Sequence, residues 1–416
     1  MFAGVKGNGV LDYVSCWHRK AISHMTANPA IRTAFVSTNS ITQGEQVGVL
    51  WSELYRLGAK IHFAHRTFQW SSEARGKAAV HCVIIGFALH DGVAKTLFDY
   101  ETLQGEPHAL KVSNINPYLV EGDDNFLTKR RSHFKPSVPA IAFGSMPNDG
   151  GHLLLDPEQK KSLVAEERKA EPWLRLILGS EEFINGIERW CLWLNGISPA
   201  ELRSLPLVKG RLEKVREHRA ASPREATQAL AATPTLFGEI RQPSGTYLAI
   251  PKTSSERRAY IPIGFLPQAI IANTELFTIA DAGLFHFGVL TSLMHMAWVR
   301  AVCGRLKSDY RYSAGIVYNN FPWPEPDEKQ TVAVEKAAQE VLNARSRYPA
   351  STFADLYDPL AMPPDLSAAH RSLDKAVDAA YGKKSFASEA ERVAFLFKRY
   401  ESLTSLLSAA AKKKKK

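Results

Sequence analysis

The chain has 416 residues, of which 45% are hydrophobic and 23% are charged. This length and composition are typical of a folded protein with two or three domains and argue against long disordered segments. The formal net charge is +10, but five lysines at 412–416 supply half of this surplus. We expect this terminal run to be a solvated, disordered end, with a phosphate-binding arm as the weaker alternative.

Two further classes are excluded by the sequence. No apolar run reaches the roughly 18 to 20 residues that a membrane-spanning helix needs, and the N-terminus lacks the pattern of a signal peptide. The cysteines occur singly, without a C-x-x-C pair, so neither a zinc site nor a disulfide framework is indicated. We therefore expect a cytoplasmic protein with buried, reduced thiols at Cys16, Cys82, Cys191 and Cys303.

The first hundred residues alternate between helix-like and strand-like patterns. Apolar spacing predicts a helix over residues 10–25, whose buried face would contain Leu11, Val14, Trp17 or His18, Ala21 and Ile22. A short strand at 33–41 and a second helix at 44–58 follow, with Gly58 as its C-cap. Strands are predicted at 60–68 and 78–89, and the second is apolar enough to be central in a sheet. This part is an α/β half-domain.

The residues after about 90 show a different pattern of predicted elements. Short strands punctuated by proline and glycine run from about residue 91 to 326 and predict a mixed α+β domain. Three helix-period segments follow the proline-rich stretch at 319–330 and predict a small all-helical unit. We expect four parts, at residues 1–105, 106–326, 327–411 and 412–416.

Several long stretches resemble one known family. They include LDYVSCWHRKA, AFVSTNSITQGEQVGVLW, IHFAHRTFQWSSEARGKAAVHCVIIGF, YLAIPKTSSERRAYIPIGF and HFGVLTSLMHMAWVRAVCGRLKSDYRYSAGIVYNNFPWPEP. Over residues 4–326 the chain resembles the γ-type DNA adenine-N6 methyltransferases, specifically the type IIL (MmeI-like) restriction-modification family. The resemblance implies part of a doubly wound, Rossmann-like methyltransferase sheet, a DNA target-recognition domain and a helical C-terminal domain. It also implies S-adenosylmethionine as methyl donor and duplex DNA as substrate.

Two motifs that the family implies are missing from this chain. These are the glycine-rich cofactor loop and the Asn-Pro-Pro-aromatic catalytic tetrapeptide, which we expect to lie upstream. The glycines of Gly4-x-x-Gly7-x-Gly9 follow no apolar strand, so we interpret them as a flexible lead-in. The sequence Asn116-Pro117-Tyr118 has only one proline, and we interpret it as a turn that opens the recognition domain.

The resemblance places the target-base side of the cleft around RTFQWSSEARGK. An enzyme that modifies a base inside duplex DNA must extrude it and hold it by stacking. We expect Trp70 first and Phe68 second to provide this stacking, with a strand-end core role as the alternative for Phe68. Arg66, Arg75 and Lys77 could contact the flanking phosphates or be solvated charges.

Polar residues after the first strand are candidates for the cleft wall. Open α/β sheets place ligand-contacting loops at the carboxyl ends of their strands. We therefore expect Thr38, Asn39 and Ser40, together with Gln43, to line the cleft, unless Ser40 or Thr42 caps the next helix. No metal site is expected, because the spacing of His62, His65 and His81 does not match H-E-x-x-H and their neighbours are apolar.

The recognition half contains three basic segments that predict DNA contacts. The first is expected to be an exposed helix or loop and contains Lys209, Arg211, Lys214, Arg216, Arg219 and Arg224. The second is a loop between strands with Lys252, Arg257 and Arg258. The third follows a helix that begins near Leu290 and ends at Gly304. In an extended backbone, four charged residues at alternating positions of this segment would lie on one face. They are Arg305, Lys307, Asp309 and Arg311.

Within the third segment we expect Lys307 and Asp309 to read bases, and Arg305 and Arg311 to contact phosphates or support the fold. Two interpretations of the whole chain remain open. It is either part of a split adenine methyltransferase that needs a second polypeptide, or a non-catalytic DNA-binding remnant or recognition subunit.

Overall fold

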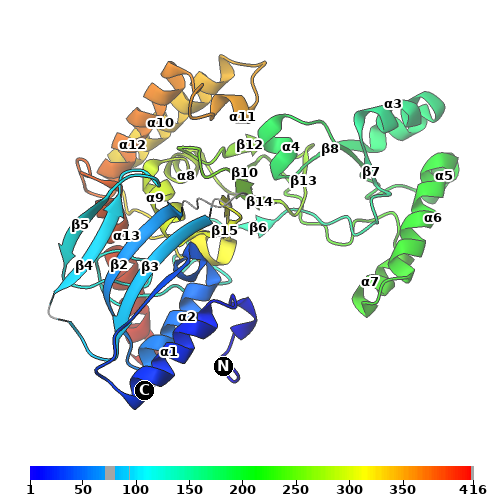
Figure 1. The fold of residues 1–416 in the computed structure, drawn as a ribbon. Coiled ribbons are helices and arrows are strands. Elements are labelled where there is room, and N and C mark those ends of the chain that lie inside the picture. The colour runs from blue at the N-terminus through cyan, green and yellow to red at the C-terminus, as the bar shows by residue number, and fades with distance from the viewer. Residues whose placement is uncertain (71–79, 93, 414–416) are drawn as a thin grey trace. The chain divides into compact units, whose positions relative to one another are not determined.

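The computed structural model describes residues 1–70, 80–92 and 94–413 (Figure 1). They form two compact units, each assembled from segments far apart in the sequence. The first contains Met1–Phe134, Met294–Pro326 and Asp378–Lys416, and the second contains Lys135–Leu293 and Asp327–Val377. The four-part linear division stays a prediction, since the units cut across it. One unit boundary does fall between Pro326 and Asp327, where the helical segment was expected to begin.

The first unit contains a five-stranded mixed sheet (Figure 1). β3 pairs antiparallel with β1 and with β2, β2 pairs parallel with β4, and β4 pairs antiparallel with β5. The apolar strand expected at the centre is therefore β3, which has a neighbour on both sides. The spatial order is β1-β3-β2-β4-β5, with bounds β1 (Thr33–Thr38), β2 (Lys60–Trp70), β3 (Val80–Ala88), β4 (Lys95–Tyr100) and β5 (Pro107–Val112).

Two helices, α1 (Ser15–Ala27) and α2 (Glu45–Arg56), pack against this sheet. The His18 ring of α1 stacks at 5.6 Å on Phe87 of β3, and Trp51 of α2 lies 6.3 Å from His18. The buried face of α1 contains His18, whereas Trp17 is 50% exposed. Gly58 follows α2 with φ +93°, which agrees with its predicted capping role.

Distant segments complete the first unit. They are α9 (Leu293–Val302), β15 (Gly304–Leu306), β16 (Asp309–Arg311), the π-helical turn η5 (Ala314–Tyr318) and α13 (Glu389–Lys413). Aromatic packing joins them, because Trp298 of α9 lies 5.2 Å from Phe397 of α13, and Tyr118 lies 5.0 Å from the same ring. The helix α13 runs through Lys413, and Lys414 to Lys416 lie outside the described residues.

The second unit contains two small sheets. One has the order β12-β10-β14-β6 and consists of β6 (Ala142–Phe143), β10 (Tyr247–Pro251), β12 (Gly264–Leu266) and β14 (Leu276–Ile279). The other has the order β13-β8-β9-β7 and consists of β7 (Leu154–Leu155), β8 (Leu174–Leu178), β9 (Trp190–Leu192) and β13 (Ile271–Ala272). A further short strand, β11, spans Thr253–Ser254.

Helices surround these sheets in the second unit. They are α3 (Pro157–Glu166), η3 (Arg168–Trp173), α4 (Ser180–Asn185), α5 (Pro199–Arg203), α6 (Pro206–Ala220), α7 (Glu225–Ala229), α8 (Leu284–Leu290), α10 (Glu328–Ser346), α11 (Phe353–Leu356) and α12 (Pro364–Ala380). One apolar core joins β7, β8 and β9 to α3, α5 and α6 through residues such as Leu155, Leu192 and Leu212. This part is mixed α+β, as predicted.

The C-terminal residues are helical, as expected, but they do not form one separate body. Helices α10 and α11, and α12 as far as Val377, belong to the second unit, whereas α13 belongs to the first. Arg345 of α10 helps to hold these helices in the second unit, because its guanidinium donates to the Ile263 carbonyl at 2.6 Å and to the Tyr357 hydroxyl. Tyr260 also donates to Asp374 of α12 at 2.7 Å.

The cysteines and the apolar helices bear on two expectations from the sequence. All four cysteines are free; Cys82, Cys191 and Cys303 are buried as predicted, whereas Cys16 is partly exposed. Across the described ranges, no helix combines the length and apolar character that crossing a membrane requires.

Candidate functional site

The segment that follows β1 is held by a polar network rather than by helix caps. The Ser40 hydroxyl donates to Asp12 Oδ2 at 2.7 Å, and Gln46 Nε2 donates to the same oxygen at 2.9 Å and to the Ser40 carbonyl. The Thr42 hydroxyl donates to the Asn39 carbonyl, and α2 has Gly44 as N-cap without a side-chain bond. The capping alternative is therefore wrong for Ser40 and Thr42.

This network leaves part of the segment accessible. Thr38 is exposed, and its hydroxyl lies 3.0 Å from that of Ser40. Asn39 is nearly buried and reaches Thr67 Oγ1 on β2 at 3.5 Å, and Gln43 is buried. The role of Thr38, Asn39 and Ser40 in lining a cleft stays a prediction, and Thr38 is the most accessible of the three.

An aromatic row runs along the ends of β2 and β4. Phe68 stacks on Tyr100 at 5.4 Å and lies 6.3 Å from Trp70, and His65 stacks on Phe98 at 4.1 Å. Trp70 is 47% exposed, so one end of the row presents an open indole. Tyr100 was not predicted as part of the row, because the pairing of β2 with β4 brings it there and no local motif marks it.

The histidines of this region have ordinary structural roles. His62 Nε2 lies 2.7 Å from the His90 carbonyl, and His65 Nδ1 lies 2.8 Å from the Tyr100 hydroxyl. Burial lowers the pKa of His65. Within residues 1–70, 80–92 and 94–413, no group of three His, Cys, Asp or Glu side chains could hold a metal ion.

The basic residues beside the aromatic row differ in what they contact. Arg66 pairs with Asp99 at 2.9 Å, and its Nε donates to the Leu119 carbonyl at 2.9 Å. Its guanidinium therefore joins β2 to β4 and to the turn at Leu119 that follows β5. Arg75 and Lys77, the other two candidates for phosphate contacts, lie outside the described residues.

The Asn116-Pro117-Tyr118 sequence forms a buried turn, as predicted. Asn116 Oδ1 accepts hydrogen bonds from the backbone N–H groups of Tyr118 and Val120, and Leu119 has a φ of +56°. The Tyr118 hydroxyl accepts from the Leu127 N–H at 2.9 Å. The side chains that resemble a catalytic motif are thus engaged in folding.

The predicted base-reading segment is a β-hairpin. β15 and β16 pair antiparallel, and the chain reverses at Lys307, which has a φ of +57°, and Ser308. Arg305 is opposite Tyr310, and Leu306 is opposite Asp309. Because facing residues share a side of the hairpin, Arg305 and Asp309 lie on opposite sides. The expectation of one extended run with all four charged residues on one face is wrong.

Exposure distinguishes the four charged residues of this hairpin. Lys307 is exposed at the turn, and Asp309 is partly exposed. The Arg305 guanidinium carbon lies 4.0 Å from the centroid of the Tyr310 ring, so this side chain packs along β16. Arg311, partly exposed, is opposite Gly304. Base reading by Lys307 and Asp309 stays a prediction, as do phosphate or structural roles for Arg305 and Arg311.

A backbone contact joins this hairpin to the segment after β1. The Gly44 N–H donates to the Val302 carbonyl at 3.1 Å, at the end of α9. A Cβ on Gly44 would lie 3.1 Å from the Gly304 Cα, and Gly44 has a φ of +68°. Gly44 therefore favours glycine, whereas a Cβ on Gly304 would lie 3.7 Å from the Gly44 Cα, an ordinary contact; the start of the hairpin lies directly against the N-terminus of α2.

The second basic segment lies between β10 and β12. The Lys252 ammonium is 3.2 Å from Glu275 Oε1, and Arg258 Nη1 donates to Ser254 at 3.5 Å. Arg257 is exposed. Of these three predicted DNA contacts, Arg257 has the most accessible side chain. All three stay predictions.

The first basic segment forms α6, and one of its faces is buried. That face contains Val208, Leu212, Val215 and Arg219. Arg219 is fully buried and donates to the carbonyls of Pro147, Asn148, Leu230, Thr233 and Leu236. The expectation of an exposed Arg219 is wrong, because its guanidinium satisfies backbone oxygens inside the fold.

The other basic residues of α6 differ in accessibility. Arg211 donates to the carbonyls of His152 and Leu154, both at 2.8 Å, and burial lowers its pKa. Lys209 and Lys214 are exposed. Contacts of Lys209 and Arg211 with DNA stay predictions, and Lys209 has the freer side chain.

Three family models match consecutive parts of the chain. They describe the DNA-methyltransferase domain of MmeI at residues 1–99, its target recognition domain at 121–325 and its C-terminal domain at 326–408. The matched segments contain, in this order, the aromatic row except Tyr100, the three basic segments and most of the C-terminal helices. They define a protein related to DNA methyltransferases with a target recognition domain.

Two relatives are similar over nearly the whole chain. DNA methyltransferase A of Bacillus subtilis (strain 168) is 41% identical over 405 residues, covering 97% of this chain and 45% of the relative. The solved structure of the type IIL restriction-modification enzyme MmeI in complex with DNA matches with a TM-score of 0.88 and 49% identity, covering 97% of this chain and 54% of that one. The chain belongs to the MmeI-like type IIL restriction-modification family. It spans about half the length of these relatives.

Proposed function

We propose that this chain supplies the target-base side and the target-recognition part of a site-specific DNA adenine-N6 methyltransferase in a restriction-modification, phage-defence system. The aromatic row ending in the open Trp70 indole carries the proposal, because an extruded base needs a stacking ring. Trp70 then stacks on the flipped adenine. Lys307 and Asp309 read base edges of duplex DNA, with Arg257 and Lys209 at the phosphates.

The methyl donor in this proposal is S-adenosylmethionine, but the glycines of this chain do not fit a cofactor loop. Gly4 and Gly7 have φ near +85° and precede η1 (Asn8–Val10), a single turn of 3-10 helix. A cofactor loop instead joins a strand to a helix. The cofactor loop and the Asn-Pro-Pro-aromatic motif would therefore come from a second polypeptide segment, the proposed partner.

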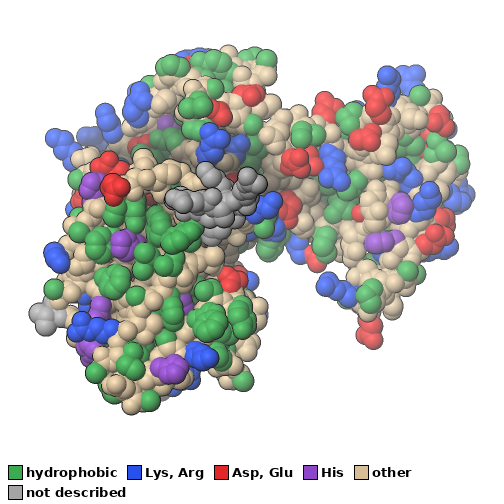
Figure 2. Space-filling model, viewed as in Figure 1, with side chains coloured by type: hydrophobic (Ala, Val, Ile, Leu, Met, Phe, Trp, Pro, Cys, Tyr) green, Lys and Arg blue, Asp and Glu red, His purple; other side chains and the backbone are tan. Residues whose placement is uncertain are grey.

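The edge of the sheet supports such a partner. Among the described strands, β1 pairs only with β3, so its other edge is available for pairing. Val36 of β1 is 51% exposed, and Tyr13 and Trp17, in the same compact unit, are 80% and 50% exposed. Figure 2 shows hydrophobic side chains gathered over the region of α1 and α2. We propose that the partner adds strands beside β1 and covers these side chains.

A recognition subunit or remnant without methyl transfer is the alternative. It is favoured by one observation, that the accessible basic side chains of Lys209, Arg257 and Lys307 could bind DNA without a cofactor. Reconstitution separates the two proposals. The full chain is mixed with a purified polypeptide that carries the cofactor loop and the Asn-Pro-Pro-aromatic motif, and transfer of labelled methyl groups to duplex DNA is measured.

For a split enzyme we expect N6-methyladenine only when both polypeptides are present, and no S-adenosylmethionine binding to this chain alone by calorimetry. A partner whose motif asparagine is replaced by alanine is the control. Sequence-specific DNA binding by the mixture without methyl transfer would instead support the recognition subunit. Absence of DNA binding would contradict both proposals.

A further inference from the structure

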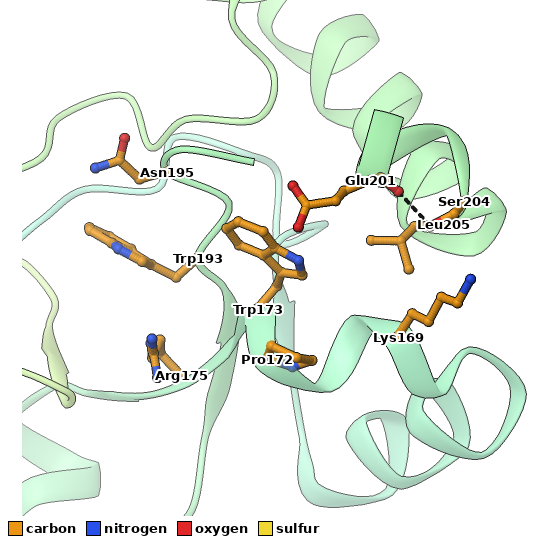
Figure 3. Close-up of a pocket in the computed structure, with 9 residues that line it drawn as sticks. All are labelled: Lys169, Pro172, Trp173, Arg175, Trp193, Asn195, Glu201, Ser204 and Leu205. Carbon is orange, nitrogen blue, oxygen red and sulfur yellow. Dashed lines mark hydrogen bonds between the residues drawn. The ribbon is translucent and has the colours of Figure 1, made fainter. Parts of the chain in front are cut away.

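A hollow of about 580 Å³ lies on the second unit, and its lining residues precede the three basic segments in sequence (Figure 3). Its lining comes from η3, the start of β8, the residues after β9, and α5, and comprises Lys169, Pro172, Trp173, Arg175, Trp193, Asn195, Glu201, Ser204 and Leu205. The volume falls within the range of sites for small organic ligands.

Two indole rings form its apolar surface. Trp173 and Trp193 are each partly exposed and pack against the core beneath, and the backbone N–H of Trp193 donates to the backbone carbonyl of Trp173 at 2.8 Å. Phe237 meets Trp193 edge-on at 5.0 Å. The Trp193 ring is thus packed against both the core and Phe237. Neither indole nitrogen has a hydrogen-bond partner among the described residues.

The charges on the rim are separated. Lys169 and Arg175 have no acidic partner within the part of the chain that the structure describes, and both are exposed. The Glu201 carboxylate accepts from the Ser198 N–H and hydroxyl at 3.0 and 2.6 Å, and the Ser198 hydroxyl lowers the pKa of Glu201. In Figure 3, Arg175 lies on one side of Trp173, and Glu201 and Lys169 lie on the other.

We propose that this hollow is a nucleotide-binding subsite, in which a base stacks on Trp173 and Trp193 and its phosphate lies beside Arg175. Stacking tolerates any base, whereas the Glu201 carboxylate is only an acceptor. Bases with an exocyclic amine, such as adenine, therefore fit better than uracil, which presents carbonyl oxygens. The ligand is either a free nucleotide or an unpaired nucleotide of a DNA strand.

Binding of defined probes to the full chain tests this subsite. Adenosine monophosphate and uridine monophosphate are titrated by calorimetry, and a fluorescein-labelled oligodeoxyadenylate of eight residues is titrated by anisotropy. We expect tighter binding of the adenine nucleotide, and at least about a tenfold loss of affinity in Trp173→Leu and Arg175→Gln. In Glu201→Gln, the preference for adenine over uracil should shrink.

Trp17→Leu is the matched control, because Trp17 is also half exposed but lies in the other compact unit. Arg175→Gln alters an exposed side chain, so its result stands even if Trp173→Leu lowers the unfolding temperature. Binding of the oligonucleotide alone would identify an unpaired strand as the ligand. No binding of any probe, or unchanged affinity in Arg175→Gln, would overturn the subsite. Duplex binding, measured in the same variants, should be unchanged, so the proposed function is judged separately.

Discussion

Trp70 and Phe68 are neighbours in the aromatic row, but their surroundings assign them different roles. Phe68 stacks on Tyr100, whereas the Trp70 indole is 47% exposed. We expect Trp70→Ala to slow methyl transfer by the reconstituted enzyme, because it removes the stacking free energy of one base, about 1–3 kcal/mol. The free energy of unfolding should change little. Phe68→Ala should instead lower the free energy of unfolding by roughly 1–3 kcal/mol.

The measurements are methyl-transfer rates for the mixture and urea unfolding of this chain. A Trp70→Ala variant with unchanged transfer would contradict its stacking role, whatever its stability. Tyr13→Ala, at another highly exposed aromatic residue in the same unit, tests whether loss of any exposed ring has the same effect on unfolding.

His18 should make the first unit sensitive to acid. Burial lowers the pKa of His18 to about 4, from the usual 6.5. Between these values the unfolded chain binds a proton that the folded chain does not, so stability falls as the pH drops from 6.5 to 4. The full effect is about 3 kcal/mol.

His18→Phe keeps a ring beside Phe87 but removes this titration. Urea unfolding at several pH values between 7 and 4 should show a smaller loss of stability on acidification in the variant than in the unchanged chain. Parallel pH profiles for the two proteins would show that His18 is not the source of the sensitivity.

At the scale of elements, the close packing of α2 leads to opposite predictions for two helical glycines. A Cβ on Gly48 would lie 2.4 Å from the Leu127 carbonyl oxygen, whereas a Cβ on Gly210 of α6 would meet no atom within 4 Å. Gly48→Ala should lower the free energy of unfolding by about 1–3 kcal/mol despite better helix propensity. Gly210→Ala should raise it by up to about 1 kcal/mol. Denaturant titration measures both, and destabilisation of equal size would refute the packing argument.

The hairpin of β15 and β16 carries a prediction about sequence preference. Lys307 at the turn and Asp309 on β16 are accessible, so Lys307→Ala and Asp309→Ala should relax preference among duplexes by about 1–3 kcal/mol per base pair read. Selection from a randomised duplex library measures this preference. Arg257→Ala is the comparison, because loss of a phosphate contact weakens all sequences equally. Uniform weakening in the hairpin variants would make them phosphate contacts.

For the whole molecule, the proposed phosphate contacts predict a steep salt dependence. The logarithm of the association constant with duplex DNA should fall linearly with the logarithm of salt concentration, because each neutralised phosphate releases a counterion. Lys209→Gln should reduce the slope by about one. Arg219→Gln should instead unfold the second unit, since the buried Arg219 guanidinium donates to five backbone carbonyls. Anisotropy titrations from 50 to 200 mM salt measure the slope.

Local patterns predicted much of the first unit, including the central apolar strand β3, the two helices and the cap at Gly58. They failed where distant parts of the chain decide the outcome. The buried face of α6 ends in Arg219, a charged residue that no apolar periodicity would place inside. The reversal at Lys307 lacks the glycine that usually marks such turns. The division of the C-terminal helices between two units depends on contacts such as that of Arg345 with Ile263.

The approach of Gly44 to Gly304 has a consequence for how new specificities can arise. The contact between the start of the hairpin and the N-terminus of α2 is made by main-chain atoms. In the proposed enzyme, substitutions at Lys307 or Asp309 would therefore change the bases that are recognised without moving the start of the hairpin. The number of base pairs between the modified adenine and the recognised bases would then stay constant in related enzymes, while the recognised bases themselves vary.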